Sequence, residues 1–275
     1  MQTLSTIREL LAARGLRPKH RYGQNFLHDQ NQLRRLLNAA AIQPGELVLE
    51  VGPGTGTLTE ALVELGATVI AAELDADMAA IVDERLGERI TLLRGDCLDG
   101  KHALAPALRA ALGGRGFALV ANLPYGAATP LMMTLLTEHP ECRGQFVTIQ
   151  REVADRLMAQ PDRKQYGPLT VTAQVMATIE PIGTIPPSCF WPAPEVVSAM
   201  VAIRPRNASA VDDPKAFASF VQRLFAMRRK QLRAILGKAF PLSEEFNPRQ
   251  RPETLDPAQL VRLWQAARAH AEGAG

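Results

Sequence analysis

The sequence predicts an α/β fold built on a mostly parallel sheet, and three observations support this prediction. From Gly45 to Gln150, short β-branched or apolar runs alternate with Ala- and Leu-rich segments of helical period, as in strands joined by crossover helices. A glycine-rich turn follows the first run, where a strand leads into a helix. The chain has 275 residues, 47% of them hydrophobic, which is enough for one large or two modest cores. A three-layer architecture is therefore expected.

Five apolar runs of the first region are expected to be strands: "GELVLEV", "TVIAAEL", "RITLLRG", "FALVAN" and "QFVTIQ". The later run "YGPLTVTAQVMA" is expected to be a helix. Two further runs, "TIEPIGTIPP" and "VVSAMVAIRP", are bounded by prolines. They fit late strands that close the sheet, for which an antiparallel direction is admissible.

The stretch 204–214 is polar, bounded by prolines and without periodicity, so it marks the expected domain boundary. We expect a first domain over residues 1–206, which begins with a basic arm at 1–22. A second, helical domain is expected over residues 207–275. Neither part contains an internal repeat or a low-complexity tract.

A helix is expected to begin at Asp213 and Pro214, as N-cap and first helical residue. One apolar stripe continues to residue 236 and indicates one amphipathic helix. Arg228 falls on the apolar side, where an arginine is more often the partner of a carboxylate or a carbonyl than a ligand contact. The basic residues outside the stripe are Arg223, Arg229, Lys230 and Arg233.

The net charge of +3 conceals an uneven distribution. Residues 1–22 carry five Lys or Arg and one acid, and residues 204–275 carry thirteen Lys or Arg and seven acids, so the middle of the chain has a net charge of −7. Such a distribution suits two ends that contact a polyanion and a middle that binds a small ligand. Solvated helix faces explain the same charges equally well.

The cysteine pattern and the apolar runs favour a cytoplasmic protein. The three cysteines are far apart and without CxxC spacing, so they indicate neither a disulfide framework nor a zinc site. The five histidines are scattered, and no metal is expected. Charges interrupt every apolar run well before the roughly 18 residues that a membrane span needs. The N-terminal stretch fits an ordinary leading helix better than a transit peptide.

The stretch "LVLEVGPGTGTLTEAL" predicts a strand, a glycine turn and a helix start, with Gly52, Gly54 and Gly56 in the turn. Glu73 ends the next strand, where an acid can accept hydrogen bonds from ribose hydroxyls. This pair fits NAD and S-adenosylmethionine almost equally. Two details favour the methyl donor: the GxGxG spacing is not that of pyrophosphate binders, and Pro53 lacks an N–H that a phosphate would use.

Two further acids lie near this turn. Asp96 ends the third strand, where its carboxylate can accept from the exocyclic amine of an adenine, although a plain loop or N-cap acid is the alternative. Glu50 precedes the glycine turn and either orients it or lies near the amino group of the donor. A structural role for Glu50 is equally well supported.

The motif "NLPY" follows the fourth strand. Asn122 lies at the carboxyl end of that strand, which is where ligands bind in doubly wound sheets. Pro124 holds Leu123 extended, so that a carbonyl from this region points in a set direction. The Asn122 amide oxygen and this carbonyl are two acceptors, which is what an exocyclic NH₂ needs. Tyr125 supplies a ring on which a base can stack, at roughly 1–3 kcal/mol.

Taken in order, these motifs resemble one family, the small-subunit ribosomal RNA adenine dimethyltransferases (KsgA family). The resemblance covers residues 17 to 265 and is carried by "YGQNFL", "LEVGPGTGTLT", "AAELD", "GD", "NLPY", "YGPLTV", "PPSCFWPAPEVVSAMV" and "FAMRRKQLRAIL". It implies a Rossmann-like class I methyltransferase with a seven-stranded, mostly parallel sheet and a small helical C-terminal domain. It also implies methyl transfer from S-adenosylmethionine to two adjacent adenosines of 16S rRNA, in the small ribosomal subunit or its precursor.

The resemblance also implies roles for single residues. Asn25 and Leu27 would cover the donor, and Gly52 would lie under its methionine part. Glu73 would bind its ribose, Asp96 its adenine, and Asn122 would lie where donor and target meet. The residues at the target adenine would be Asn122, Leu123, Tyr125 and Phe190, and those on rRNA Arg223, Arg229, Lys230 and Arg233.

Two departures from the family pattern leave alternatives open. Gly126, Ala127 and Ala128 replace the usual Asn-Ile-Ser/Thr after the NLPY motif, and Arg151 replaces a lysine. The first change affects where the target base lies rather than the class of reaction. The alternatives are a large-subunit rRNA adenine methyltransferase of the macrolide-resistance type and a ribosome-assembly factor with weak or lost methylation. A monomer is expected.

Overall fold

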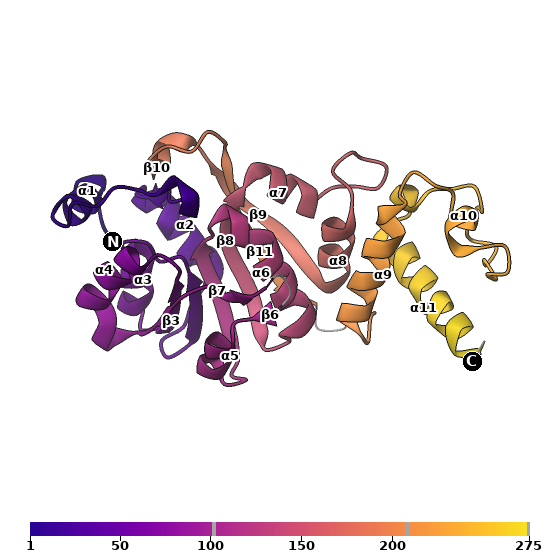
Figure 1. The fold of residues 1–275 in the computed structure, drawn as a ribbon, viewed down its shortest axis with the longest axis horizontal. Helices are drawn as coiled ribbons and strands as arrows, with labels where there is room; N and C mark the ends of the chain where they lie inside the picture. Colours follow the sequence, from indigo (N-terminus) through magenta and orange to yellow (C-terminus); the bar gives the residue numbers. More distant parts are fainter. Residues whose placement is uncertain (101–102, 207–209, 274–275) are drawn as a thin grey trace. The chain divides into compact units, whose positions relative to one another are not determined.

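A seven-stranded sheet organises the described part of the chain, which comprises residues 1–100, 103–206 and 210–273 of the computed structural model (Figure 1). Its strand order is β4-β3-β2-β7-β8-β11-β9. The strands are β2 (Leu47–Val51), β3 (Thr68–Glu73), β4 (Thr91–Arg94), β7 (Phe117–Asn122), β8 (Cys142–Gln150), β9 (Ala177–Ile185) and β11 (Ser198–Pro205). Each run expected to be a strand overlaps one of them.

The strand directions confirm the mostly parallel sheet. Strand β2 pairs in parallel with β3 and with β7, β3 with β4, and β7 with β8. Strand β11 lies antiparallel to β8, with Ser198 opposite Gln150. Because parallel strands share one carboxyl edge, the ends of β2, β3 and β7 lie side by side. We call the loops that follow these three strands the strand-end loops.

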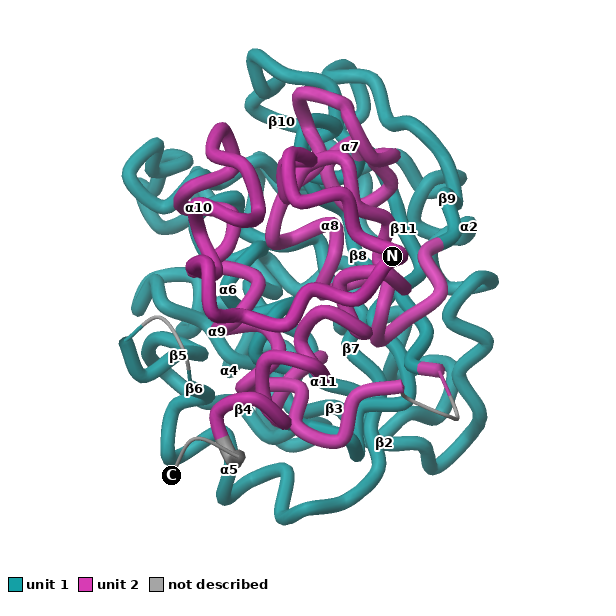
Figure 2. The backbone as a smooth tube through the Cα atoms, turned by 90° about the vertical axis from the view of Figure 1, so that its right-hand side faces the viewer, with its two compact units in different colours: residues 1–135, 139–154, 180–205 teal, residues 136–138, 155–179, 206–275 magenta. Residues whose placement is uncertain are grey.

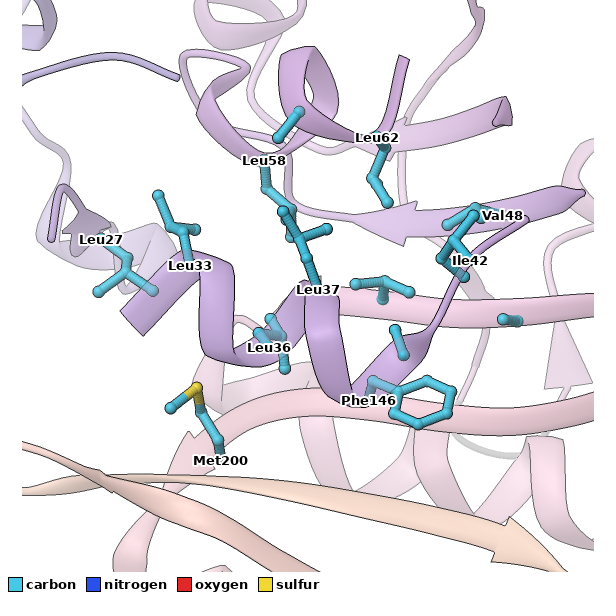
Figure 3. Close-up of a cluster of buried hydrophobic side chains, with 14 of the residues drawn as sticks. Leu27, Leu33, Leu36, Leu37, Ile42, Val48, Leu58, Leu62, Phe146 and Met200 are labelled. Atoms are coloured by element: carbon cyan, nitrogen blue, oxygen red, sulfur yellow. The ribbon is translucent and has the colours of Figure 1, made fainter. Parts of the chain in front are cut away.

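Helices cover the sheet because each buries one apolar face. In α2 (Gln30–Ala40), Asp29 caps the first turn by accepting from the N–H groups of Asn31 and Gln32. Its Leu33, Leu36 and Leu37 belong to the same buried cluster as Phe146 and Met200 of the sheet (Figure 3). The other helices of this region are α1 (Leu4–Ala12), α3 (Thr57–Glu64), α4 (Ala76–Leu86), α5 (Pro106–Leu112), α6 (Tyr125–Glu138) and α7 (Arg151–Leu157). Among the described residues, none of the helices is both long and apolar enough to cross a bilayer.

A two-stranded ribbon joins distant parts of the sequence. Strand β1 (Phe26–Leu27) pairs antiparallel with β10 (Phe190–Trp191), which sets Leu27 opposite Phe190. A second ribbon pairs β5 (Leu98–Asp99) with β6 (Ala103–Leu104). Short 3₁₀ turns lie at His20–Tyr22, Gly87–Arg89, Pro187–Cys189 and Pro252–Thr254.

The chain divides into two compact units (Figure 2). Unit 1 comprises residues 1–135, 139–154 and 180–205, and unit 2 comprises 136–138, 155–179 and 206–275. The expected boundary at residues 206 and 207 had assigned segment 155–179 to the first domain. That segment packs in unit 2 because Tyr166 is fully buried in a cluster with Phe217 and Phe225 and donates its hydroxyl to the carbonyl of Leu255 at 2.7 Å. Residues 207–209, at the expected boundary, lie outside the described residues.

Unit 2 is helical, with α8 (Pro168–Met176), α9 (Pro214–Ala226), α10 (Leu232–Leu236) and α11 (Pro257–Gly273). Asp213 caps α9 by accepting from the N–H of Ala216 at 2.9 Å, as expected. The expectation of one helix up to residue 236 was wrong, because α9 ends at Ala226. The chain then turns, and the N–H of Leu232 donates to the carbonyl of Gln250 at 2.8 Å instead of continuing the helix. The apolar stripe persists because α9 and α10 bury side chains in one cluster.

Candidate functional site

The glycine turn after β2 is the first of the strand-end loops. Gly52, Gly54 and Gly56 all have positive φ angles, of 73°, 61° and 89°, which glycine adopts at little cost. Their N–H groups already donate within the fold, to the Ala72 carbonyl, the Glu73 carboxylate and the Pro53 carbonyl. These donors are therefore not free for a pyrophosphate, so the turn suits a ligand without phosphates.

Glu73 ends β3 and joins two of these loops. Its carboxylate accepts from the N–H of Gly54 at 3.1 Å and from the N–H of Asp75 at 2.9 Å. The side chain is only 7% exposed, and burial raises the pKa of Glu73 although backbone hydrogen bonds from Asp75, Gly54 and Leu74 oppose the shift. The carboxylate still has lone-pair capacity with which it can accept from a hydroxyl group.

Asn122 ends β7, and its amide is already oriented. Its Nδ2 donates to the backbone carbonyl of Asn25 at 3.1 Å, which leaves the side-chain oxygen as the acceptor. The carbonyl of Pro124 accepts from the first turn of α6, whose N–H groups lie 3.0 and 3.1 Å away. The carbonyl expected from the Leu123 and Pro124 region to serve a target amine is therefore assigned to Leu123.

The strand-end loops and the N-terminal segment pack closely together. A Cβ atom added to Gly52 would lie 3.0 Å from Cγ of Pro124, and one added to Gly54 would lie 3.0 Å from the ring of Phe26. Such distances are tighter than nearly all real Cβ contacts, so a side chain at either position would push Pro124 or Phe26 aside. The structure therefore brings together Asn25, Gly52, Glu73 and Asn122, and their roles towards a ligand stay predictions.

The two predicted stacking rings differ in exposure. Tyr125 is half-buried, and its hydroxyl lies 3.3 Å from Oγ of the buried Ser198, which anchors the ring. Phe190 is only 4% exposed and belongs, with Leu27, to the cluster under the sheet. In this structure β10 pairs with β1 and the Phe190 ring packs in the same buried cluster as Leu27, so its stacking role stays a prediction from the resemblance. Leu27 is buried in the same way, so only its backbone can contact a donor.

Asp96 is exposed in the loop after β4. One of its carboxylate oxygens accepts from the N–H of Leu98 at 3.0 Å, which stabilises the loop. This oxygen therefore has the structural role of a loop acid, which was the alternative to binding an adenine. The second oxygen can still accept from an amine.

Glu50 is the most strongly perturbed acid near the site. It is 2% exposed, and its Oε2 has no hydrogen-bond partner among the described residues. Burial raises the pKa of Glu50 to about 8, and the nearby charge of Glu73 adds to the shift. Glu50 is thus protonated over much of the neutral range.

The basic residues expected to contact rRNA fall into two groups. Arg223, Arg229 and Lys230 are exposed in unit 2. Arg233 instead donates from one guanidinium nitrogen to three backbone carbonyls after α10, at 2.9 to 3.4 Å, so it stabilises the chain there. Arg228 pairs with Glu253 at 2.8 Å, which confirms its predicted structural role.

The N-terminal basic arm also uses charges internally. Arg14 pairs with Glu84, and Lys19 pairs with Asp75 and Asp77. Fewer of its cations than the sequence suggested are therefore available to a polyanion.

Sequence reasoning missed the residues that support this site. Asp75, Lys19, Gln24 and Ser198 all contact or fix the strand-end residues, but none has a spacing that identifies it. Leu74 was also missed: it is 54% exposed although it lies between the buried acids Glu73 and Asp75. The sequence could have indicated Leu74, because it is an apolar residue in "ELD" directly after the expected ribose-binding acid. Among the described residues, no group of three or more His, Cys, Asp or Glu side chains is arranged to hold a metal ion.

Two solved structures share this fold. A dimethyladenosine transferase from Plasmodium falciparum superposes with a TM-score of 0.71 at 23% identity, over 86% of this chain and 95% of that one. The 23S rRNA methyltransferase ErmE superposes with a TM-score of 0.66 at 24% identity, over 88% of this chain and 99% of that one. At such identities the likeness concerns the fold, which is that of the class I methyltransferases.

Curated relatives and a family model are more similar to this chain in sequence than these two structures are. A "Ribosomal RNA small subunit methyltransferase A" of Rhodococcus opacus is 39% identical, over 94% of this chain and 91% of that one. The protein of the same name in Geobacillus thermodenitrificans is 37% identical, over 93% of each chain. The model of the family described as ribosomal RNA adenine dimethylase matches residues 15–269. The chain therefore belongs to the ribosomal RNA adenine dimethylase family.

Proposed function

We propose that this protein transfers methyl groups from S-adenosylmethionine to N6 of two adjacent adenosines in the 3′-terminal hairpin of 16S rRNA. Its substrate is the small ribosomal subunit or a precursor of it, and it acts as a monomer in the cytoplasm during a late step of small-subunit biogenesis. Support comes from the small-subunit relatives at 37 to 39% identity.

The orientation of the Asn122 amide carries this proposal. Because Nδ2 donates to Asn25, the amide oxygen faces the site as an acceptor, next to the carbonyl of Leu123. These two acceptors bind the two hydrogens of the adenine amine and favour its pyramidal form, which restores the nitrogen lone pair. Tyr125 supplies the stacking surface for the base, which is worth about 1–3 kcal/mol.

The strand-end loops suit the methyl donor by their chemistry. When bound, S-adenosylmethionine supplies an electrophilic sulfonium methyl group. The carboxylate of Glu73 would accept from the ribose hydroxyls, and the second oxygen of Asp96 from the adenine amine. Gly52 would lie under the methionine part, and the backbone of Asn25 and Leu27 would cover it. Exposed Leu74 offers an apolar contact for the adenine ring.

The residues need only position the reacting atoms and exclude water. Asn122 and the carbonyl of Leu123 would hold the amine nitrogen with its lone pair towards the methyl group of the bound donor, from which S-adenosylhomocysteine would leave. The methylated nitrogen then loses its proton to solvent without a dedicated base. The second transfer on each adenine repeats these steps.

Binding of rRNA is proposed for the exposed cations of unit 2. Arg223, Arg229 and Lys230 would contact phosphates, so affinity falls steeply with salt. Arg233 would support the same segment by holding three carbonyls rather than by contacting RNA. The N-terminal arm would add the cations that it does not use internally.

Tritiated S-adenosylmethionine and small subunits that lack methyl groups at the 3′-terminal hairpin test the proposal, with large-subunit RNA and Asn122→Ala alongside. Label recovered as dimethyladenosine from small subunits alone supports it. Label in large-subunit RNA alone would favour the macrolide-resistance type instead. Tight binding of donor and subunits without any label would favour an assembly factor that has lost methylation.

A further inference from the structure

A buried carboxylate fastens the N-terminal segment to the loop after β3. Both oxygens of Asp75 accept from this segment: Oδ1 from Nζ of Lys19 at 2.7 Å and Oδ2 from Nε2 of Gln24 at 2.7 Å. Lys19 and Gln24 are also joined to each other, since the Lys19 N–H donates to Oε1 of Gln24 at 2.8 Å. We call Lys19, Gln24 and Asp75 the clasp.

The clasp is too well satisfied to be a chance surface contact. Asp75 is only 2% exposed, and burying an ionised carboxylate is costly unless it is fully paired. Burial raises the pKa of Asp75, but the hydrogen bonds from Lys19 and Gln24 outweigh that effect and keep the pKa below its ordinary value. The carboxylate is therefore charged and paired throughout the neutral range.

Both ends of the clasp lead to proposed site residues. The N–H of Asp75 donates to the carboxylate of Glu73 at 2.9 Å, so the clasp fixes one ligand of the ribose. Gln24 immediately precedes Asn25, whose carbonyl accepts from Nδ2 of Asn122 at 3.1 Å. A shift of the N-terminal segment would therefore turn the amide of Asn122.

We infer that Asp75 is a positioning residue for methyl transfer, which acts with Lys19 and Gln24 to hold the Asn25 carbonyl against Asn122. This inference rests on the proposed roles of Asn122 and Glu73 and adds a device that sets their geometry. The clasp residues are assigned no role in binding the donor or the adenine. Their effect passes through the backbone at residue 25.

Exchanging the side-chain amide of position 24 and the carboxylate of position 75 tests the clasp. Asp75→Asn removes the buried one of the two carboxylates that pair with Lys19, the other being Asp77. Gln24→Glu sets a second carboxylate against Asp75. In the double variant the amide introduced at position 75 can donate to the carboxylate introduced at position 24, which also restores an acid beside Lys19. Glu84→Gln is the matched control, because it breaks the Arg14 pair on the same segment without touching the clasp.

We expect each single variant to lower kcat for labelling of small subunits by about tenfold or more, because small displacements of a positioned group are costly. The affinity for S-adenosylhomocysteine, measured by calorimetry, should fall less than kcat, and the double variant should regain much of kcat. Glu84→Gln should match the wild type.

A purely structural role would give a different pattern. Activity would then follow the melting temperature of each variant and recover when the assay is cooled. Wild-type kcat in both single variants, or no recovery in a double variant that melts normally, would overturn the inference.

Hydrogen exchange over residues 19–27 measures the clasp without methyl transfer. Faster exchange in the single variants and recovery in the double variant would be seen even if the wild type labelled no rRNA. Failure of the proposed function and failure of the clasp are thus separate results, and unchanged exchange in both single variants would overturn the clasp.

Discussion

The strand-end loops of unit 1 and the basic segment 223–233 of unit 2 are held in different ways. At the strand-end loops, two polar side chains are fixed by hydrogen bonds within unit 1: Asn122 by Asn25 of the N-terminal segment, and Glu73 by Gly54 and Asp75. In the basic segment, Arg223, Arg229 and Lys230 lie exposed. Arg233 instead donates from its guanidinium to backbone carbonyls.

This difference separates two kinds of function. Groups that orient a reacting atom must be held to within a fraction of an ångström, so they depend on their neighbours. Groups that neutralise phosphates act through charge, so each contributes separately and tolerates motion. Substitutions in the strand-end loops should therefore change the chemical step, whereas those in the basic segment should change binding and its dependence on salt.

The largest effect is expected for Asn122→Ala. This change removes the acceptor oxygen for the target amine and the donor to Asn25, so methyl transfer should fall about a hundredfold or more. Binding of S-adenosylhomocysteine and the melting temperature should change little. Single-turnover labelling of small subunits measures the effect, and a rate within a factor of a few of the wild type would show that the amide does not hold the amine.

Gly52→Ala should reduce both stability and donor binding. A φ of 73° at a residue with a Cβ costs about 1–3 kcal/mol, and the new Cβ would lie 3.0 Å from Pro124. Thermal melting and the KM for S-adenosylmethionine measure the two consequences. Gly126→Ala is the matched control, because its Cβ would meet no atom within 4 Å. Equal melting temperatures for the two variants would contradict the close contact.

Local rules explain why much of the strand-end region could be predicted. A glycine turn and a proline have conformational preferences that depend on the residue type alone, as at Gly52 and Pro124. Asn122 ends an apolar run, which predicts a strand end at that position. Phe190 could not be assigned in this way, because its inward direction depends on pairing with Leu27, far away in the sequence. The end of α9 at Ala226 was missed for a similar reason: the hydrogen bond from Leu232 to Gln250 replaces a helical one, and periodicity carries no information about it.

Within the basic segment, the exposed and the bound cations should respond differently. Arg229→Gln with Lys230→Gln should weaken binding to small subunits and lower the slope of log affinity against log salt by about one per lost phosphate contact. Arg233→Gln should mainly lower the melting temperature, since three carbonyls lose their donor. Filter binding at several salt concentrations and thermal melting distinguish them, and an unchanged slope in the first variant would remove these residues from the rRNA interface.

Glu50→Gln should stabilise unit 1 in a pH-dependent way. The pKa of Glu50 is about 8 in the fold, above its ordinary value of 4.5, so the folded state retains a proton that the unfolded chain releases. The contribution of Glu50 to the free energy of unfolding is therefore greatest below pH 4.5 and declines as the pH rises towards 8. Glutamine removes this loss, so the variant should melt above the wild type by a margin that grows from pH 5 to pH 8. A constant margin would show that Glu50 is ionised in the fold.

The smallest effect is expected at Gly126, the second residue of α6, where a departure from the family pattern is expected from the sequence. Gly126 is exposed, and a Cβ there would meet no atom within 4 Å, so Gly126→Asn should fit without strain. It should raise the free energy of unfolding by about 0.5 kcal/mol by restricting the unfolded chain. Methyl transfer should stay at the wild-type rate, because position 126 touches neither Asn122 nor its partner Asn25. If labelling of small subunits rises while the melting temperature does not, a side chain at 126 contacts the target base, and the restrained geometry of the strand-end loops would extend into the first turn of α6.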